Sequence, residues 1–590
     1  MTRPAAMAVR IVPWALLVSA CDVTLVDGDA GDSPAEIGAD ADADADALED
    51  VPLDTAPPDC SYAPDPVEPP TPLDPPAAVD YLIVSADPLL DAANALAGHR
   101  AAGGHTVEVL PVSAALDDGT GRPDTAGYAA RLRHLVAARR AALDPERELH
   151  VLLFGDAGES WDGDPAVVPT AAWPDPGGWV AAITSDNVFV DLDDDALPDA
   201  AIGRAPFRVP ADAQRWVAAV IDDETRYEPG PWNRRLHVFA SEGGFGDLLD
   251  DILLDVGMRV IGEVPPEWSV TFTYAAPSSP YTYPPDRFSD RVYAYLNGGG
   301  FLMSYIGHGS PSGFADVSWD GGPSGPIFDT ARLADIEIAH RPPLLVFIAC
   351  STGSFDTGDS ISERILREPG SSPAVLASTE ISHPYSNMIF IREIERIALS
   401  ERPRTLGELF RRAKRAMLEH HDDLRDFLDD LSSLQLTAEE MAGLPPAHLH
   451  MYTLLGDPGM ELPWPRGTVD VAVENDRLAP GRVARLCAQV HGPPAGTAHV
   501  SFEIERTELA RPIEPWSLAD PDWRETVMAN HASANDKVVW SADVPYEGGG
   551  FGLSFVVPPD TRRRDHHVVV YAEDGVDDAM GSALLRIRPE

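Results

Sequence analysis

The chain has 590 residues, which is too long for one domain, and its hydrophobic content of 44% is sufficient for a large core. It carries 95 acidic against 44 basic residues, a formal net charge of −51. This balance excludes the positive surface that nucleic acids and anionic membranes require, so we expect no nucleic-acid partner. The only lysines, Lys414 and Lys537, do not follow a glycine-rich loop, which excludes a P-loop nucleotide site.

The first twenty residues, 1–20, have the pattern of an export signal. Arg3 and Arg10 make the start positive, and the apolar segment that follows is too short to span a bilayer. The segment ends in Val18-Ser19-Ala20-Cys21, which resembles a bacterial lipobox. Lipidation of Cys21 would anchor the chain to a membrane, and we then expect a lipoprotein of the cell envelope or surface, outside the cytoplasm. The alternative is an ordinary secretory signal with a chance cysteine.

Residues 21–78 are acidic and rich in proline, contain no lysine or arginine, and include an Ala-Asp repeat over 39–46. Such a segment buries too little apolar surface to offset its ordering entropy. The composition predicts a disordered stalk, and a calcium-binding tract is the less favoured interpretation.

From residue 79 to 465 the pattern changes to apolar runs that alternate with helical patterns. This alternation predicts an α/β fold, with mostly parallel sheets flanked by helices, in one large unit or two fused sheets. The expected strands are 81–84, 106–110, 149–154, 200–204, 236–240, 301–306, 344–349 and 374–378, and the expected helices are 91–102, 128–142, 211–224, 288–296, 361–368 and 406–420.

Residues 466–590 show short strands separated by turns, without long helical patterns. The spacing predicts an immunoglobulin-like β-sandwich with a structural or adhesive role. The expected strands are 469–473, 485–490, 498–505, 538–544, 551–557 and 567–571.

Two apolar strands of the α/β region end in residues that carry chemistry. The strand at 301–306 ends in Gly307-His308-Gly309, and the strand at 344–349 ends in Cys350. Sites in open α/β sheets form at the carboxyl ends of strands, and a histidine beside a thiol promotes the nucleophilic thiolate. Alone, Cys350 reads as an inert core residue and His308 as a turn residue. The pair, in this order on consecutive apolar strands, favours catalysis.

The chain resembles the gingipain family of cysteine peptidases, within the caspase-like group, from about Asp80 to Leu462. The motifs that carry the resemblance are the two strand ends together with Asp80-Tyr81-Leu82-Ile83-Val84, Ser185-Asp186-Asn187-Val188-Phe189, Ile202-Gly203-Arg204, Ser241-Glu242-Gly243-Gly244 and Leu454-Leu455-Gly456-Asp457-Pro458. The resemblance implies a cysteine endopeptidase that acts on proteins or peptides and needs no cofactor for its chemistry.

By position, the resemblance assigns Cys350 as nucleophile, His308 as base and acid, and Glu242 as the acidic residue that orients the histidine. It assigns the backbone amides of Gly309 and Cys350 to the oxyanion hole. The resemblance does not assign the residues of the specificity pocket securely. The candidates are Asp247 or Asp251, His383 and Tyr385.

Asp191, Asp193, Asp195 and Asp199 alternate along one acidic segment and are candidate ligands of a structural calcium ion. Ala196 stands where a calcium-binding EF-hand has glycine, so the segment is not an EF-hand, and a solvated turn is the alternative. No zinc pattern is found. Cys60 and Cys487 either pair or stay free, which the sequence does not decide.

We therefore expect an exported, lipid-anchored cysteine endopeptidase that acts through an acyl-enzyme. A sortase-like transpeptidase, in which an amine replaces water, would share the same chemistry. The alternative from another class is a catalytically inactive surface-binding protein on the same fold.

Overall fold

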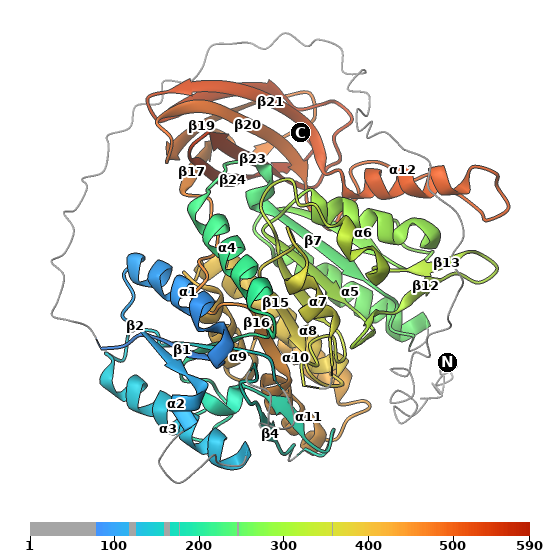
Figure 1. Cartoon of the computed structure of the whole chain (residues 1–590). Coiled ribbons are helices and arrows are strands. Elements are labelled where there is room, and N and C mark those ends of the chain that lie inside the picture. The colour runs from blue at the N-terminus through green and yellow to red at the C-terminus, as the bar shows by residue number, and fades with distance from the viewer. Residues whose placement is uncertain are drawn as a thin grey trace. The chain divides into compact units, whose positions relative to one another are not determined.

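The computed structural model describes residues 78–116, 125–157, 166–175, 177–244, 247–356 and 358–589. These residues form two compact units, the first made of 78–465 with 511–536 and the second of 466–510 with 537–589 (Figure 1). The segment 511–536, which we expected in the sandwich, therefore belongs to the first unit. The predicted export signal, Cys21, the stalk up to residue 77 and Cys60 lie outside the described residues. Among the described residues, no helix is both long and apolar enough to cross a membrane.

The first unit is built on one ten-stranded sheet, in the order β2-β1-β3-β6-β16-β15-β14-β9-β7-β8. Its strands are β1 (Tyr81–Ser85), β2 (Val107–Pro111), β3 (His150–Phe154), β6 (Ala201–Ala205), β7 (Arg235–Ala240), β8 (Ser269–Tyr274), β9 (Leu302–Ile306), β14 (Leu344–Ile348), β15 (Val375–Ser378) and β16 (Tyr452–Leu455). Five of the ten, β1, β3, β14, β15 and β16, are buried along their whole length, as continuous apolar runs predict.

The sheet consists of two halves that run in opposite directions. Within the sheet only the pair β15–β16 is antiparallel, and every other pair is parallel. We call β2, β1, β3, β6 and β16 the first half, and β15, β14, β9, β7 and β8 the second half. The carboxyl ends of the two halves therefore lie at opposite edges of the sheet.

Helices cover both faces of the sheet. Helix α4 contacts both α1 and α7, and helix α8 contacts both α5 and α9. The bounds are α1 (Leu90–Ala102), α2 (Val112–Leu116), α3 (Thr125–Ala142), α4 (Pro210–Thr225), α5 (Asp247–Glu263), α6 (Phe288–Asn297), α7 (Ile361–Arg367), α8 (Pro384–Arg396), α9 (Leu406–Glu419), α10 (Asp423–Ser432) and α11 (Ala438–Met451). Local sequence sets several starts: Ser360 and Glu363 form a capping box at α7, and Thr405 caps α9.

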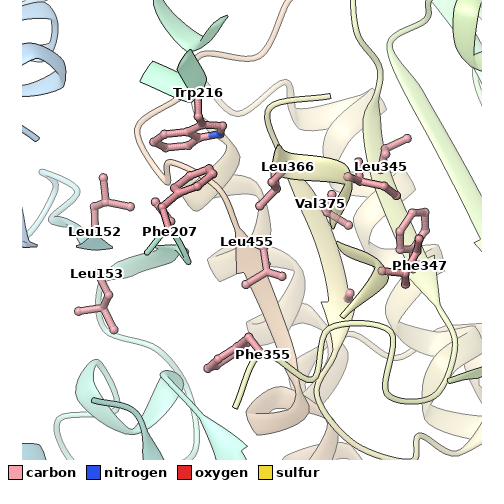
Figure 2. Close-up of a cluster of buried hydrophobic side chains, with 14 of the residues drawn as sticks. Leu152, Leu153, Phe207, Trp216, Leu345, Phe347, Phe355, Leu366, Val375 and Leu455 are labelled. Atoms are coloured by element: carbon pink, nitrogen blue, oxygen red, sulfur yellow. The ribbon is translucent and has the colours of Figure 1, made fainter. Parts of the chain in front are cut away.

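One apolar core connects the two halves of the sheet. Figure 2 shows Leu455 of β16 between Phe207 and Trp216, which belong to the first half and its helix layer, and Val375 of the second half. All four are almost completely buried. The prediction of a mostly parallel sheet flanked by helices is thus confirmed.

The second unit is a β-barrel or sandwich domain. Its strands form one eight-stranded sheet, in the order β17-β19-β22-β21-β20-β23-β24-β18, and an additional pairing of β17 with β24 closes this sheet on itself. The alternating burial along β19 matches strands with one face toward a core. The bounds are β17 (Gly467–Val473), β18 (Arg477–Leu478), β19 (Val483–His491), β20 (Ala495–Ile504), β21 (Val538–Glu547), β22 (Gly550–Val556), β23 (Asp565–Glu573) and β24 (Asp578–Ile587). Cys487 on β19 is disulfide-bonded.

Residues 511–536, which we call the arm, join β20 to β21 in sequence but pack on the edge strand β8. The arm contains α12 (Trp523–Asn535), a helix that the sequence analysis did not predict. The side-chain amide of Asn535 accepts a hydrogen bond from the Phe272 N–H (2.7 Å) and donates one to the Phe272 carbonyl (3.0 Å). Because an amide group occupies both backbone positions of Phe272, the arm covers part of the edge strand as a neighbouring strand would.

Candidate active site

Three neighbouring strands of the second half end at the same level. The last residues of β14, β9 and β7 pair with one another in register. Cys350, His308 and Glu242 each lie two residues beyond one of these ends. The register therefore places the three residues that we predicted as catalytic along one edge of the sheet, at the carboxyl ends of parallel strands.

Hydrogen bonds hold His308 from two directions. Its Nε2 lies 2.9 Å from the carbonyl oxygen of Gly243, and because a carbonyl only accepts, Nε2 carries the proton. The Tyr305 hydroxyl donates to the backbone carbonyl of His308 at 2.9 Å. In the neutral ring, Nδ1 is then the basic nitrogen, which is the form that a general base requires.

The loop that begins at Cys350 is tightly constrained. Cys350 is only 7% exposed, and its Sγ lies 3.7 Å from the carbonyl oxygen of Ser382. The next residue, Ser351, has a φ of 54°, which is a strained conformation for a residue other than glycine. The Ser351 N–H donates to the carbonyl of Glu380 at 3.0 Å, and this bond helps to hold the turn. Such strain is typical of positions where a backbone must present one side chain in a fixed direction.

The segment after His308 packs directly on the cysteine loop. A Cβ added to Gly309 would lie 2.8 Å from Cβ of Ala349, 2.8 Å from Cγ2 of Thr352 and 2.9 Å from the Cys350 carbonyl oxygen. Only glycine allows this approach. The backbones that supply the two predicted oxyanion amides, those of Gly309 and Cys350, are therefore in contact.

Glu242 begins the loop that also supplies the Gly243 carbonyl. Its side chain is exposed, whereas Gly243 contacts the imidazole directly. One direct hydrogen bond that orients His308 thus comes from a backbone carbonyl one residue beyond the predicted carboxylate, a contact that the sequence did not predict.

A cavity of about 160 Å³ opens beside Cys350 and His308. His383, which we predicted for the pocket, lines it, and burial lowers the pKa of this histidine to about 3, so it is neutral. Tyr385 does not line the cavity, because its hydroxyl donates to Asp429 on α10 at 2.7 Å. Asp247 begins α5, whose later residues line the cavity.

Trp179 also lines this cavity, although the sequence did not predict it. The Trp179 Nε1–H donates to the Ile381 carbonyl at 2.7 Å, and its ring meets His383 edge-on, with ring centres 5.1 Å apart. Trp179 follows a pair of glycines in a loop without apolar periodicity, so no local signal marked it. Helix α8 was also missed, although its apolar spacing carries an amphipathic signal.

The acidic segment forms a loop that brings three of its four predicted ligands together. Carboxylate oxygens of Asp191, Asp193 and Asp195 all lie within 4.8 Å of one another. Asp199 instead accepts the N–H of Leu192 at 2.9 Å and closes the loop. The donor set consists of carboxylate oxygens, which suits a hard cation such as calcium.

The family model described as Peptidase family C25 matches residues 74–463. Among solved structures, the Arg-specific cysteine proteinase gingipain R shares 15% identity, with 88% of this chain and 100% of that chain covered and a TM-score of 0.47. The complex of the Porphyromonas gingivalis RgpB pro- and mature domains gives 15% identity, 86% and 100% coverage, and a TM-score of 0.47. The Saccharomyces cerevisiae separase–securin complex gives 10% identity, 58% and 18% coverage, and a TM-score of 0.30.

A search of curated proteins returns no match. The family match extends over most of the first unit and includes the strand ends that carry Glu242, His308 and Cys350. The chain belongs to peptidase family C25, a family of cysteine peptidases.

Proposed function

We propose that this chain is an active cysteine endopeptidase in which Cys350 is the nucleophile and His308 the general base and acid. The observation that carries the proposal is the common level of the two strand ends, together with the Gly243 carbonyl that fixes the imidazole tautomer. The thiol is buried beside a cavity, and a substrate side chain can lie in that cavity.

In this mechanism, Nδ1 of His308 takes the proton of the Cys350 thiol, and the thiolate attacks the carbonyl carbon of the scissile peptide. The amides of Gly309 and Cys350 donate to the oxyanion that develops. The imidazolium then returns the proton to the leaving amine, and water, activated by the same imidazole, releases the acyl group from the sulfur. Glu242 stabilises the imidazolium by its negative charge, while the Gly243 carbonyl keeps the ring in position.

The decisive experiment treats the purified full-length chain with an irreversible thiol-directed peptide reagent and locates the adduct by mass spectrometry. We expect an adduct at Cys350 that is lost in Cys350→Ala and His308→Ala but retained in His421→Ala, which removes an exposed histidine outside the site. A folded chain in which Cys350 reacts no faster than a free thiol would overturn the proposal in favour of an inactive binding protein.

Product analysis separates hydrolysis from transfer. The chain is incubated with a cleavable peptide in the presence of an added amine such as a glycine peptide. We expect a free carboxylate at the new C-terminus. A product joined to the amine would replace the endopeptidase by a sortase-like transpeptidase.

Two further features of the chain belong to this proposal. Lipidation of Cys21 would place the enzyme at the cell envelope, and a Cys21→Ser variant should then lose an incorporated fatty-acid label. Incorporation that persists in the variant, or fails in the unaltered chain, contradicts the anchor.

Calcium bound by Asp191, Asp193 and Asp195 would stabilise their loop by neutralising three clustered carboxylates. We expect calcium to raise the midpoint of thermal unfolding, Tm, and Asp193→Asn to reduce that increase. Asp320→Asn, which removes an exposed carboxylate elsewhere, should not reduce it. A Tm that calcium leaves unchanged contradicts a calcium site.

A further inference from the structure

The cavity beside Cys350 runs between the sheet and helices α5 and α8. Side chains from β7, β8, β9, α5 and α8 form its walls, and they are mainly apolar: Val238, Val260, Phe272, Ile306, Met388 and Ile391. Five of these six are buried by the surrounding protein and Ile306 is half-buried, so the walls are set before any substrate arrives.

The depth of the cavity follows from α8. Pro384, Met388, Ile391 and Glu395 share one face of this helix and all line the cavity. At 1.5 Å per residue, Glu395 lies about 16 Å further along the helix axis than Pro384. Pro384 belongs to the segment that contacts the thiol, since Cys350 Sγ lies 3.7 Å from the Ser382 carbonyl oxygen.

Glu395 is the only acidic residue among the described side chains that line the cavity, in which α5 is described from Leu254 onward. A lysine or arginine side chain whose carbonyl carbon is held at the thiol is shorter than this depth. The described walls between the thiol and Glu395 are mainly apolar, and burial of a positive charge against them without a partner is costly.

Polar side chains of the wall near Cys350 form hydrogen bonds with other groups of the protein. The Asn387 amide donates to Ser382 Oγ at 2.9 Å and accepts from the Tyr452 hydroxyl at 2.8 Å. His383 is packed edge-on against Trp179, and its Nδ1 accepts the Tyr385 N–H at 3.2 Å. The wall therefore offers contact area for an apolar group.

We propose that this cavity binds the side chain of the substrate residue whose carbonyl is attacked, the P1 residue, and selects a large apolar side chain such as phenylalanine, leucine or methionine. This inference rests on the proposed peptidase function and names its substrate class. Burial of a side chain of that size favours cleavage over a small or charged residue by about 10- to 100-fold.

The first test compares peptides that differ only at P1, with phenylalanine, leucine, methionine, alanine, arginine, lysine or aspartate. On the full-length chain we expect kcat/KM for the large apolar residues to exceed that for arginine and lysine by about tenfold or more. The same peptides are titrated onto Cys350→Ala, where binding does not need the thiol. An apolar preference in binding without hydrolysis would support the pocket and reject the peptidase proposal. Preference for arginine or lysine, or no preference, overturns the pocket inference.

The second test fills the cavity at Gly257 of α5. A Cβ added there meets no atom within 4 Å, and Gly257 lines the cavity, so Gly257→Leu places a side chain in the space without a clash at Cβ. We expect kcat/KM for P1 phenylalanine to fall about tenfold or more while P1 alanine changes less than threefold.

The matched control is Gly98→Leu on α1, where an added Cβ also meets nothing within 4 Å and the position is exposed. It should leave the P1 profile unchanged. Equal losses for phenylalanine and alanine in Gly257→Leu would place the P1 side chain elsewhere.

Discussion

The two halves of the ten-stranded sheet use the same geometry for different purposes. In the second half, Glu242, His308 and Cys350 lie two residues beyond strand ends that are level in register. In the first half, β1, β3 and β6 also end level, and the residues two positions beyond are Asp87, Asp156 and Phe207.

The difference lies in what those side chains meet. Asp156 pairs with Arg208 and accepts the Ala157 N–H, and Phe207 packs against Trp216 in the core. Next to them, the guanidinium of Arg204 is completely buried and binds Asp186 at 2.7 Å. A level set of strand ends is therefore not sufficient for a site. The first half uses its polar groups for stability, and the second half directs His308 and Cys350 toward a cavity.

The largest effect that this comparison predicts concerns Arg204. Its guanidinium also donates to the carbonyls of Gly155, Val168 and Pro169, so Arg204→Met leaves a buried carboxylate and three carbonyls without this donor. We expect the free energy of unfolding to fall by about 3–5 kcal/mol, measured by urea denaturation. Arg208→Met, at a half-exposed ion pair, should cost about 1 kcal/mol or less. Equal costs for the two variants would contradict the assigned role of the first half.

The next effect separates the strand-end carboxylates of the two halves. Glu242→Gln should lower kcat/KM about tenfold, because the imidazolium of His308 loses a stabilising negative charge. Asp156→Asn, the matched change in the first half, should leave kcat/KM unchanged. If both variants retain full activity, Glu242 has no catalytic role and the Gly243 carbonyl orients the histidine alone.

A smaller effect is expected at Tyr305. Tyr305→Phe removes the hydrogen bond to the His308 carbonyl and should lower kcat about three- to fivefold, with a stability loss of about 1 kcal/mol. Because Tyr305 positions His308 and does not touch the substrate, KM should stay constant. A change confined to KM would argue against this positioning role.

The smallest effect is a pH dependence at Glu380, which lies two residues beyond the end of β15. Burial, assisted by the charge of Asp356, raises the pKa of Glu380 to about 7. Above pH 7 the carboxylate is ionised in both the folded and the unfolded chain, and burial of its charge destabilises the folded state. Below about pH 4.5 it is neutral in both states, and its burial carries no cost of charge. As the pH rises from 4.5 through 7, the unfolded chain ionises more readily than the folded chain, and the free energy of unfolding falls. Glu380→Gln should therefore raise Tm at pH 8 and leave Tm unchanged at pH 4, and a gain at both values would assign the effect to packing.

Much of the sheet and the identity of the site residues could be predicted because continuous apolar runs mark buried parallel strands. The runs that lead to His308 and Cys350 predicted β9 and β14 within one residue at each end. Their register could not be predicted, since pairing depends on contacts between distant segments.

Other features depend on tertiary contacts that leave little trace in the local sequence. Tyr385 was assigned to the pocket, but its hydroxyl is taken by Asp429 on a helix that had not been predicted. The arm was assigned to the sandwich because it lies between two sandwich strands in sequence. The walls of the cavity come from strands β7, β8, β9 and β14, helices α5 and α8 and the loops between elements, and only the folded chain brings them together.

The arm has a consequence for the order in which the protein is made. Within the first unit, Trp319 contacts Trp516 and Trp523 of the arm, and Asn535 holds Phe272, which lines the cavity. A ribosome completes residues 79–465 before it adds the arm, so the growing chain carries Cys350 and His308 while one wall of the cavity still lacks its outer support. A chain that stops after the C25 region therefore lacks the residues that support this wall.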